Sequence, residues 1–179
     1  MRLSKVSLIG VKRPGTCKIN MPATPELSLK EGNLAPDFTA PASGGATVSL
    51  SDFKGKNVVL YFYPKDDTPG CTKEACGFRD AYDQFTNAGA VVLGVSIDPV
   101  KKHDKFINKF NLPFTLVADE DKAIVQKYGV WGQKSFMGRK YMGTLRITFL
   151  IDPKGRIRKI WPNVKPEQHA AEVLAAIRA

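Results

Sequence analysis

The chain has 179 residues, 43% hydrophobic and 25% charged, which is typical of one globular domain with a full hydrophobic core. Three cysteines are too few for a secreted disulfide scaffold, the cysteine and histidine spacings do not suggest zinc, and no stretch approaches the ~18 apolar residues of a membrane span. The net charge of +10 invites a nucleic-acid interpretation, but the basic residues beyond the N-terminus are dispersed and lack an aromatic recognition pattern. We therefore expect neither a membrane nor a nucleic-acid partner.

Residues 1–33 are predicted to be a basic, poorly ordered extension ahead of a domain over residues 34–179. Residues 1–25 contain no acidic residue and supply +5 of the net charge of +10, through Arg2, Lys5, Lys12, Arg13 and Lys18. This character resembles a targeting peptide, yet its apolar run is too short and interrupted for a secretory signal. A cytoplasmic location is favoured, with an organelle transit peptide and translation from Met21 as alternatives, and Cys17 is interpreted as incidental.

The organised part of the chain begins with two short strands predicted around the glycine-rich turn at 43–45. Val58–Tyr63 follows as an unbroken run of β-branched, aromatic and aliphatic residues. Such a run is typical of a strand buried on both faces, so we predict that it is the central strand of a sheet. Pro64 ends this strand, and a polar loop turns the chain into a helix that opens at Cys71.

Cys71 is the first candidate functional residue because of its place at a helix N-terminus. The first turn of a helix presents unpaired N–H groups and a partial positive charge, which favour the nucleophilic thiolate. The alternative is a buried cysteine that acts as a small hydrophobic residue. Helical spacing places Ala75, Phe78, Tyr82 and Phe85 on the face of Cys71, so the thiol is expected to point into the protein.

Cys76 follows five residues later in the same predicted helix. Ideal helix geometry puts the Cα atoms of Cys71 and Cys76 about 140° apart around the axis and roughly 8.7 Å apart in space. A disulfide tolerates Cα separations of up to about 7 Å. The two cysteines therefore cannot bond in an intact helix, and a disulfide between them requires the first turn to unwind.

Downstream, predicted strands and helices alternate, which indicates parallel βαβ units and an α/β fold. Strands are predicted at 90–97 and 114–118, each followed by a helix. An antiparallel hairpin with strands at 145–151 and 156–161 precedes a closing amphipathic helix.

Four polar features of this half are candidate sites. The acidic run 119–121 lacks the ligand spacing of a calcium loop and is interpreted as a solvated turn or a helix cap. His103 and His169 lie in polar helical segments, and neither is predicted to be a metal ligand or a base. Arg146 interrupts an apolar strand, so it either faces outward or meets a buried partner or a functional anion.

The segment 64–71, PKDDTPGC, matches the P-x-x-x-T-x-x-C active-site motif of the peroxiredoxins. CTKEAC at 71–76 resembles the C-T-x-E-x-C form of the bacterioferritin comigratory protein, or Q-type, subfamily, and 137–152 resembles its second active-site strand and preceding loop. The similarity extends from about residue 35 to the C-terminus, without a departure at the motif positions. It implies a thioredoxin-like fold, with a central mixed β-sheet flanked by helices, and peroxide reduction without a cofactor or metal.

The resemblance also implies a cycle of two cysteines. Cys71 would be the peroxidatic cysteine, which hydrogen peroxide or an organic hydroperoxide oxidises to a sulfenic acid. Cys76 would be the resolving cysteine, forming a disulfide that thioredoxin or a similar dithiol protein reduces. The subfamily resemblance favours a monomer.

Four further residues acquire roles from the resemblance. Arg146 would keep the thiolate ionised and, with the Thr68 hydroxyl, donate hydrogen bonds to the peroxide oxygens. Pro64 would shield the sulfenic acid, and Glu74 would orient Arg146. Two alternatives stay open: a disulfide reductase, which would want C-x-x-C instead of C-x₄-C, and a non-catalytic binding domain that uses the basic surface.

Overall fold

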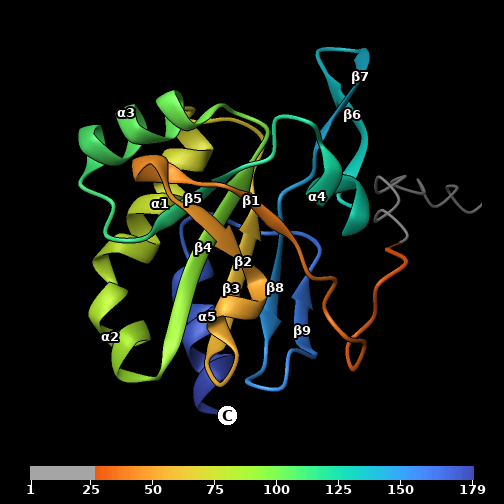
Figure 1. Ribbon diagram of the computed structural model, residues 1–179. Coiled ribbons are helices and arrows are strands. Elements are labelled where there is room, and N and C mark those ends of the chain that lie inside the picture. The colour runs from red at the N-terminus through yellow and green to blue at the C-terminus, as the bar shows by residue number, and fades with distance from the viewer. Residues whose placement is uncertain (1–26) are drawn as a thin grey trace, which may run out of the picture.

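The computed structural model of the chain describes residues 27–179 and is built on a five-stranded sheet with the order β5-β4-β3-β8-β9 (Figure 1). β3 pairs in parallel with β4, and β4 in parallel with β5, whereas β8 pairs antiparallel with both β3 and β9. The predicted central strand and the mixed sheet are thus confirmed. The strands span Asn57–Phe62 (β3), Ala90–Ser96 (β4), Thr115–Ala118 (β5), Ile147–Ile151 (β8) and Ile157–Trp161 (β9).

Helices cover both faces of this sheet, because the side chains of the central strand are apolar on both sides. Val59 and Tyr61 of β3 share a hydrophobic cluster with residues of α1, α2, α3 and α5. Leu60 and Phe62 point the other way, into a cluster that includes residues of α4 and β1. The helices span Pro69–Asp80 (α1), Tyr82–Asn87 (α2), Val100–Phe110 (α3), Ala123–Lys127 (α4) and His169–Arg178 (α5).

Two small hairpins lie outside the main sheet (Figure 1). β1 (Thr39–Pro41) and β2 (Thr47–Ser49) flank a short 3₁₀ turn, which confirms the two strands predicted around the glycines. β6 (Trp131–Phe136) and β7 (Arg139–Thr144) form a second antiparallel hairpin that the sequence pattern did not predict. Its strands are largely polar, so they carry no clear alternation of apolar and polar residues.

The helix that opens near Cys71 is shorter than its apolar spacing suggested. α1 ends at Asp80, and α2 begins at Tyr82 after a change of backbone conformation at Ala81. Phe85 is buried, whereas Tyr82 is only half-buried. The expected apolar face is therefore shared by two helices.

Residues 31–33 contact the edge strand β9. The N–H of Gly32 donates to the carbonyl oxygen of Ile157 at 2.7 Å. The predicted domain boundary after residue 33 stays a prediction, although these contacts tie part of the proposed extension to the sheet. The predictions for the remainder of the extension, including Cys17 and the alternative start at Met21, lie outside the described residues.

Asp119 caps α4, as one of the two interpretations of the acidic run proposed. Its carboxylate accepts the N–H groups of Ile124 and Val125 at 3.0 and 2.8 Å. Within residues 27–179, no cluster of three or more His, Cys, Asp or Glu side chains could hold a metal ion. The same part of the chain contains no helix with the length and apolar character needed to cross a membrane.

His103 and His169 lie on helices, as expected, and both side chains are fully buried. Each helix turns one polar side chain toward the sheet, where hydrogen-bond partners compensate for its burial. His169 pairs its Nε2 with Thr148 Oγ1 on β8 at 2.7 Å. Burial, aided by the charge of Arg146, lowers the pKa of His169 to about 4, so its ring is neutral at pH 7.

His169 is therefore expected to make the protein sensitive to acid. The unfolded chain binds a proton at His169 below its ordinary pKa of about 6.5, whereas the folded chain does not until about pH 4. Up to about 3 kcal/mol of folding free energy is lost as the pH falls through this window. Urea unfolding should show that His169→Gln is destabilised less, relative to wild type, at pH 4.5 than at pH 7. A difference that does not change with pH would contradict this assignment.

Candidate active site

Cys71 lies in the first turn of α1, directly after the loop that follows β3. Thr68 is the N-cap residue and Pro69 the first helical residue, a position that proline favours. The N–H of Thr72 bonds to the carbonyl of Thr68 at 2.8 Å, so the N–H groups of Gly70 and Cys71 precede the first intrahelical bond. The Cys71 side chain is buried, as its helical face predicted.

Arg146 reaches Cys71 from a segment 75 residues away in the sequence. Ile147 of β8 pairs with Phe62 of β3, so Arg146, one residue earlier, lies beyond the end of the central strand. Its Nη2 donates to Cys71 Sγ at 3.1 Å. A Cβ at Gly70 would lie 3.2 Å from the same nitrogen, so glycine leaves the guanidinium room to reach the sulfur. Of the orientations left open for Arg146, the structure shows the inward one, toward the buried Cys71.

Glu74 contacts the other side of the guanidinium. Nη1 of Arg146 donates to Glu74 Oε2, and the Glu74 side chain is buried one helical turn beyond Cys71. Burial raises the pKa of Glu74 to about 7, and Arg146 offsets only part of that effect. Burial alone would lower the pKa of Arg146, but the neighbouring Glu74 and Cys71 outweigh it and raise that pKa. The guanidinium thus stays charged beside the sulfur.

Thr68 and Pro64 lie in the loop that leads to Cys71. Pro64 follows the end of β3 and is half-buried. The Thr68 hydroxyl donates to the carbonyl oxygen of Lys65 at 3.0 Å, which leaves its own lone pairs free to accept a hydrogen bond. The loop therefore offers an acceptor near the thiol, where the resemblance had implied a donor.

Cys76 is a free, half-buried thiol on α1, which stays helical through both cysteines. The structure therefore does not bring the two thiols together, as helix geometry predicted.

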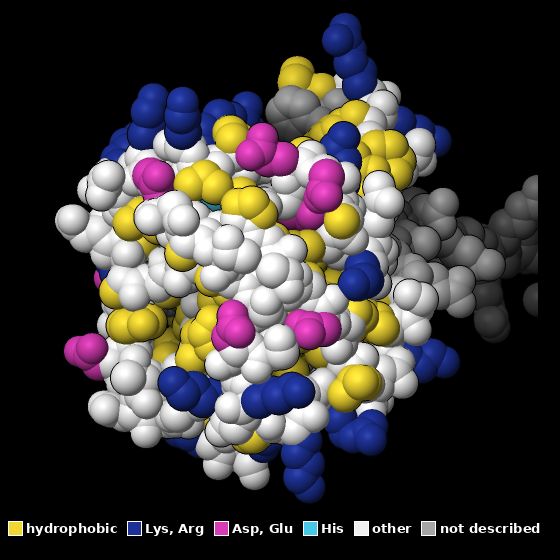
Figure 2. Space-filling model, viewed as in Figure 1, with side chains coloured by type: hydrophobic (Ala, Val, Ile, Leu, Met, Phe, Trp, Pro, Cys, Tyr) yellow, Lys and Arg dark blue, Asp and Glu magenta, His cyan; other side chains and the backbone are white. Residues whose placement is uncertain are grey.

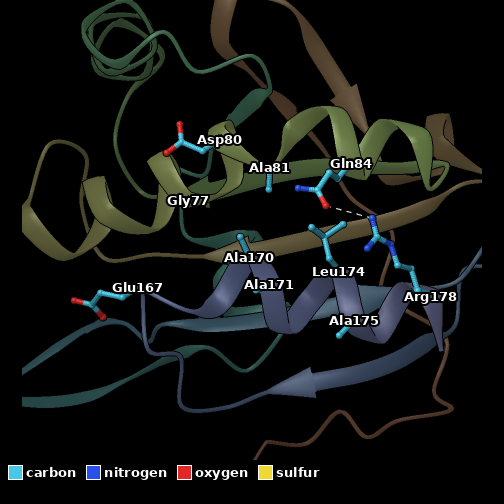
Figure 3. A pocket seen from close by; sticks show the side chains of 10 residues that line it. All are labelled: Gly77, Asp80, Ala81, Gln84, Glu167, Ala170, Ala171, Leu174, Ala175 and Arg178. Carbon is cyan, nitrogen blue, oxygen red and sulfur yellow. Dashed lines mark hydrogen bonds between the residues drawn. The ribbon is translucent and has the colours of Figure 1, made fainter.

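Gly77, the residue after Cys76, lines a groove of about 410 Å³ between α1–α2 and α5 (Figure 3). Gln84 and Arg178 bridge this groove through a hydrogen bond of 3.3 Å. Neither Cys71 nor Arg146 lines it, so the groove is separate from their contact.

Lys134 on β6 is a second cation of the site that the sequence did not reveal. Its half-buried ammonium donates to the carbonyl oxygen of Thr144 at 3.1 Å. Burial lowers the pKa of Lys134, the charge of Arg146 lowers it further, and Cys71 raises it. Lys134 is therefore electrostatically coupled to the thiol and to the guanidinium. Only the unpredicted β6–β7 hairpin places it there.

Known proteins of similar sequence and structure indicate the family of the chain. Residues 32–160 match the model of the AhpC/TSA family. A putative peroxiredoxin Bcp of Coxiella burnetii is 54% identical over 151 residues, covering 84% of this chain and 100% of the relative. Peroxiredoxin Bcp of Bacillus subtilis is 48% identical over 152 residues, covering 85% and 97%. A structure of Xanthomonas campestris peroxiredoxin Q superposes with a TM-score of 0.75 at 42% identity, covering 79% of this chain and 89% of that one.

The family match spans more than half of the chain, and both relatives are covered almost completely. The thioredoxin-like peroxiredoxin fold implied by the sequence motifs is confirmed by the superposed structure. The chain therefore belongs to the AhpC/TSA family and, within it, to the bacterioferritin comigratory protein or peroxiredoxin Q branch, whose members are thiol-dependent peroxidases that reduce peroxides with electrons from a thiol reductant.

Proposed function

We propose that Cys71 is the peroxidatic cysteine of this peroxidase. The observation that carries the proposal is the hydrogen bond of 3.1 Å from the Arg146 guanidinium to Cys71 Sγ, because a fixed positive charge favours the thiolate over the thiol. The thiolate attacks the terminal oxygen of the peroxide, an S–O bond forms and the O–O bond breaks. The departing hydroxide or alkoxide takes up a proton, and Cys71 becomes a sulfenic acid.

The residues around the thiol are suited to this step. Charge grows on the peroxide oxygens as the O–O bond breaks, and Arg146 and the free N–H groups of the first turn of α1 are donors placed to stabilise it. The Thr68 hydroxyl, which donates to Lys65, accepts the hydrogen of the incoming hydroperoxide. Pro64 covers the site at the end of β3, and Glu74 holds Arg146 in its orientation.

Cys76 is proposed as the resolving cysteine. Its thiolate attacks the sulfenic sulfur of Cys71, forming the S–S bond and releasing hydroxide, which becomes water. Because α1 is intact through both residues, the first turn must unwind before the sulfurs can meet. Thioredoxin or a similar dithiol protein then supplies two electrons and two protons to restore both thiols.

Intact mass measured after one equivalent of hydrogen peroxide tests this cycle. Wild type is expected to lose about 2 Da, since a disulfide has two hydrogens fewer than two thiols. Cys76→Ser is expected to gain about 16 Da instead, because the thiol proposed to resolve its sulfenic acid has been removed. A loss of about 2 Da that persists in Cys76→Ser would overturn the resolving role.

The remaining sequence-based expectations are part of the same proposal. Two free thiols at Cys71 and Cys76 support a reducing compartment such as the cytoplasm, with an organelle as the alternative that the basic residues 1–25 leave open. The Lys and Arg side chains on the face in Figure 2 are scattered among neutral and acidic ones, which supports the absence of a nucleic-acid partner. A monomer is proposed from the subfamily resemblance, and sedimentation tests it.

A further inference from the structure

The loop between β3 and α1 contains a buried carboxylate, Asp66, at a position that the active-site motif leaves free. Its Oδ1 accepts the hydroxyl hydrogen of Tyr63 at 2.6 Å, and its Oδ2 lies 2.7 Å from His103 Nδ1. Its backbone N–H donates to Asp98 Oδ2 at 2.8 Å. The middle of the loop is therefore anchored through three hydrogen bonds, each to a different residue.

His103 connects this anchor to the sheet. It projects from α3, which follows β4 and lies over the end of the molecule where β3 and β4 finish (Figure 1). Its fully buried ring has Nε2 3.1 Å from the carbonyl oxygen of Val117 on β5. A carbonyl oxygen only accepts, so Nε2 carries a hydrogen. The ring therefore links the loop to the sheet, with Nδ1 hydrogen-bonded to the Asp66 carboxyl and Nε2 hydrogen-bonded to β5.

Two further aspartates support this anchor: Asp98, the partner of the Asp66 N–H, and Asp67, the next residue of the loop. Asp98, which accepts the Asp66 N–H, itself accepts the Ser96 hydroxyl and the Lys102 ammonium at 3.0 Å each. Asp67 has a left-handed backbone, with φ of 56°, and both of its carboxylate oxygens accept from one lysine ammonium, at 2.9 and 2.7 Å. The loop is therefore held at two consecutive residues, Asp66 and Asp67, directly before Thr68, the N-cap residue of α1.

We propose that Asp66 and His103 form a positioning pair that fixes the active-site loop for the reaction with peroxide. Pro64 lies two residues before Asp66, and Thr68 lies two residues after it. The pair therefore sets the positions of the Pro64 ring and the Thr68 hydroxyl relative to Cys71. Arg146 reaches the sulfur from the residue before β8 and shares no hydrogen bond with the pair. Loss of the pair therefore impairs reaction with peroxide and leaves the thiolate in place. This inference rests on the proposed role of Cys71.

Two substitutions at one position separate the two contacts of His103. An asparagine amide stands near the place of Nδ1 and can still donate to Asp66, whereas a glutamine amide stands near the place of Nε2 and donates only toward Val117. His103→Gln is expected to lower the second-order rate constant for oxidation of Cys71 by hydrogen peroxide about 10- to 100-fold, as a misplaced reacting geometry does. His103→Asn should stay within about threefold of wild type. Stopped-flow fluorescence on the reduced protein measures both constants.

The rate of Cys71 alkylation by iodoacetamide distinguishes a loss of structure from a loss of positioning. A loss of structure around Cys71 would change this rate, whereas a misplaced loop would not. Alkylation needs the thiolate but not the hydroxyl of Thr68, so its rate should not fall in either variant. Equal peroxide rate constants in the two variants, or a wild-type constant in His103→Gln, would overturn the proposal. If the assignment of Cys71 is itself wrong, Cys71→Ser will still reduce peroxide. This outcome can be told apart from failure of the positioning proposal.

The wild-type protein offers a test that requires no folded variant. In a long-range ¹⁵N–¹H spectrum at neutral pH, Nε2 of His103 is expected to carry hydrogen, because its partner, the carbonyl oxygen of Val117, only accepts. His169, whose Nδ1 has no hydrogen-bond partner among the described residues, is the internal comparison. An Nε2 of His103 without hydrogen would overturn the ring orientation on which the proposal rests.

Discussion

Replacing Cys71 with serine is expected to lower peroxide reduction by at least about 10³-fold, because the hydroxyl that replaces the thiolate is a far weaker nucleophile at neutral pH. The substitution removes the sulfur that accepts the peroxide oxygen, so the hydrogen-bond donors around it no longer act on a nucleophile that can react. Peroxide consumption should be measured with dithiothreitol and, separately, with a thioredoxin system.

The fold should survive this change. Cys71 is buried, but the Arg146 guanidinium that donates to its sulfur can donate to a serine oxygen in the same place. We expect a stability loss of about 1 kcal/mol, small beside the loss of activity. Cys76→Ser is the matched control, since it removes a thiol from the same helix and should still reduce one equivalent of peroxide. A Cys71→Ser protein with substantial peroxidase activity would refute the assignment.

Replacing Arg146 with glutamine is expected to lower the rate constant for peroxide about 10²- to 10³-fold, the usual cost of removing a donor that stabilises growing charge. The guanidinium makes two contacts at once, to Cys71 Sγ and to Glu74, and a glutamine amide cannot reproduce both. Loss of the guanidinium therefore removes the hydrogen bond to the Cys71 sulfur and also removes a donor that stabilises the transition state. Stopped-flow oxidation of the reduced protein measures this effect.

The same substitution should make stability strongly dependent on pH. The folded pKa of Glu74 is already raised to about 7, so the protonated carboxyl favours folding fully below about pH 4.5 and this contribution is lost as the pH rises through 7. Without Arg146 the folded pKa rises further, because the charge that lowered it is gone. Breaking a buried pair costs about 3–5 kcal/mol where the carboxylate must ionise, so the loss in Arg146→Gln should be greater at pH 8 than at pH 6.

A double variant separates the two effects of Arg146. Adding Glu74→Gln to Arg146→Gln removes the uncompensated carboxylate, so denaturant unfolding at pH 8 should show recovered stability. Peroxide reactivity should stay low, because the donor to Cys71 is still absent. Recovery of the rate constant together with the stability would show that Arg146 acts through structure instead of chemistry.

Much of the site could be predicted from local sequence. Val58–Tyr63 is apolar on both faces, Pro64 ends it and a helix begins before Cys71, so the strand, the loop and the exposed N–H groups of the first turn follow from neighbouring residues. The separation of Cys71 from Cys76 follows from helix geometry alone. These inferences hold because each depends on backbone conformation over a few residues.

The partners of these residues depend on tertiary structure. The sequence left Arg146 open between an outward and an inward orientation, and the antiparallel register of β8 against β3 decides it by placing Arg146 beyond Phe62. Lys134 is coupled to the site through its place on the polar β6–β7 hairpin, and such a hairpin has no apolar alternation from which it could be predicted.

The buried polar residues show the same division most clearly. His103 lies in a helical segment with several charged residues, and nothing in that local pattern indicates that its ring is fully buried against Asp66 and Val117, 37 and 14 positions away. Periodicity along a chain reports which faces are apolar, whereas a buried hydrogen bond requires two particular side chains from distant segments to meet. The family, the central strand and the candidate reactive thiol can therefore be inferred from local sequence, whereas the charged and polar groups around that thiol come from distant segments that meet only in the folded protein.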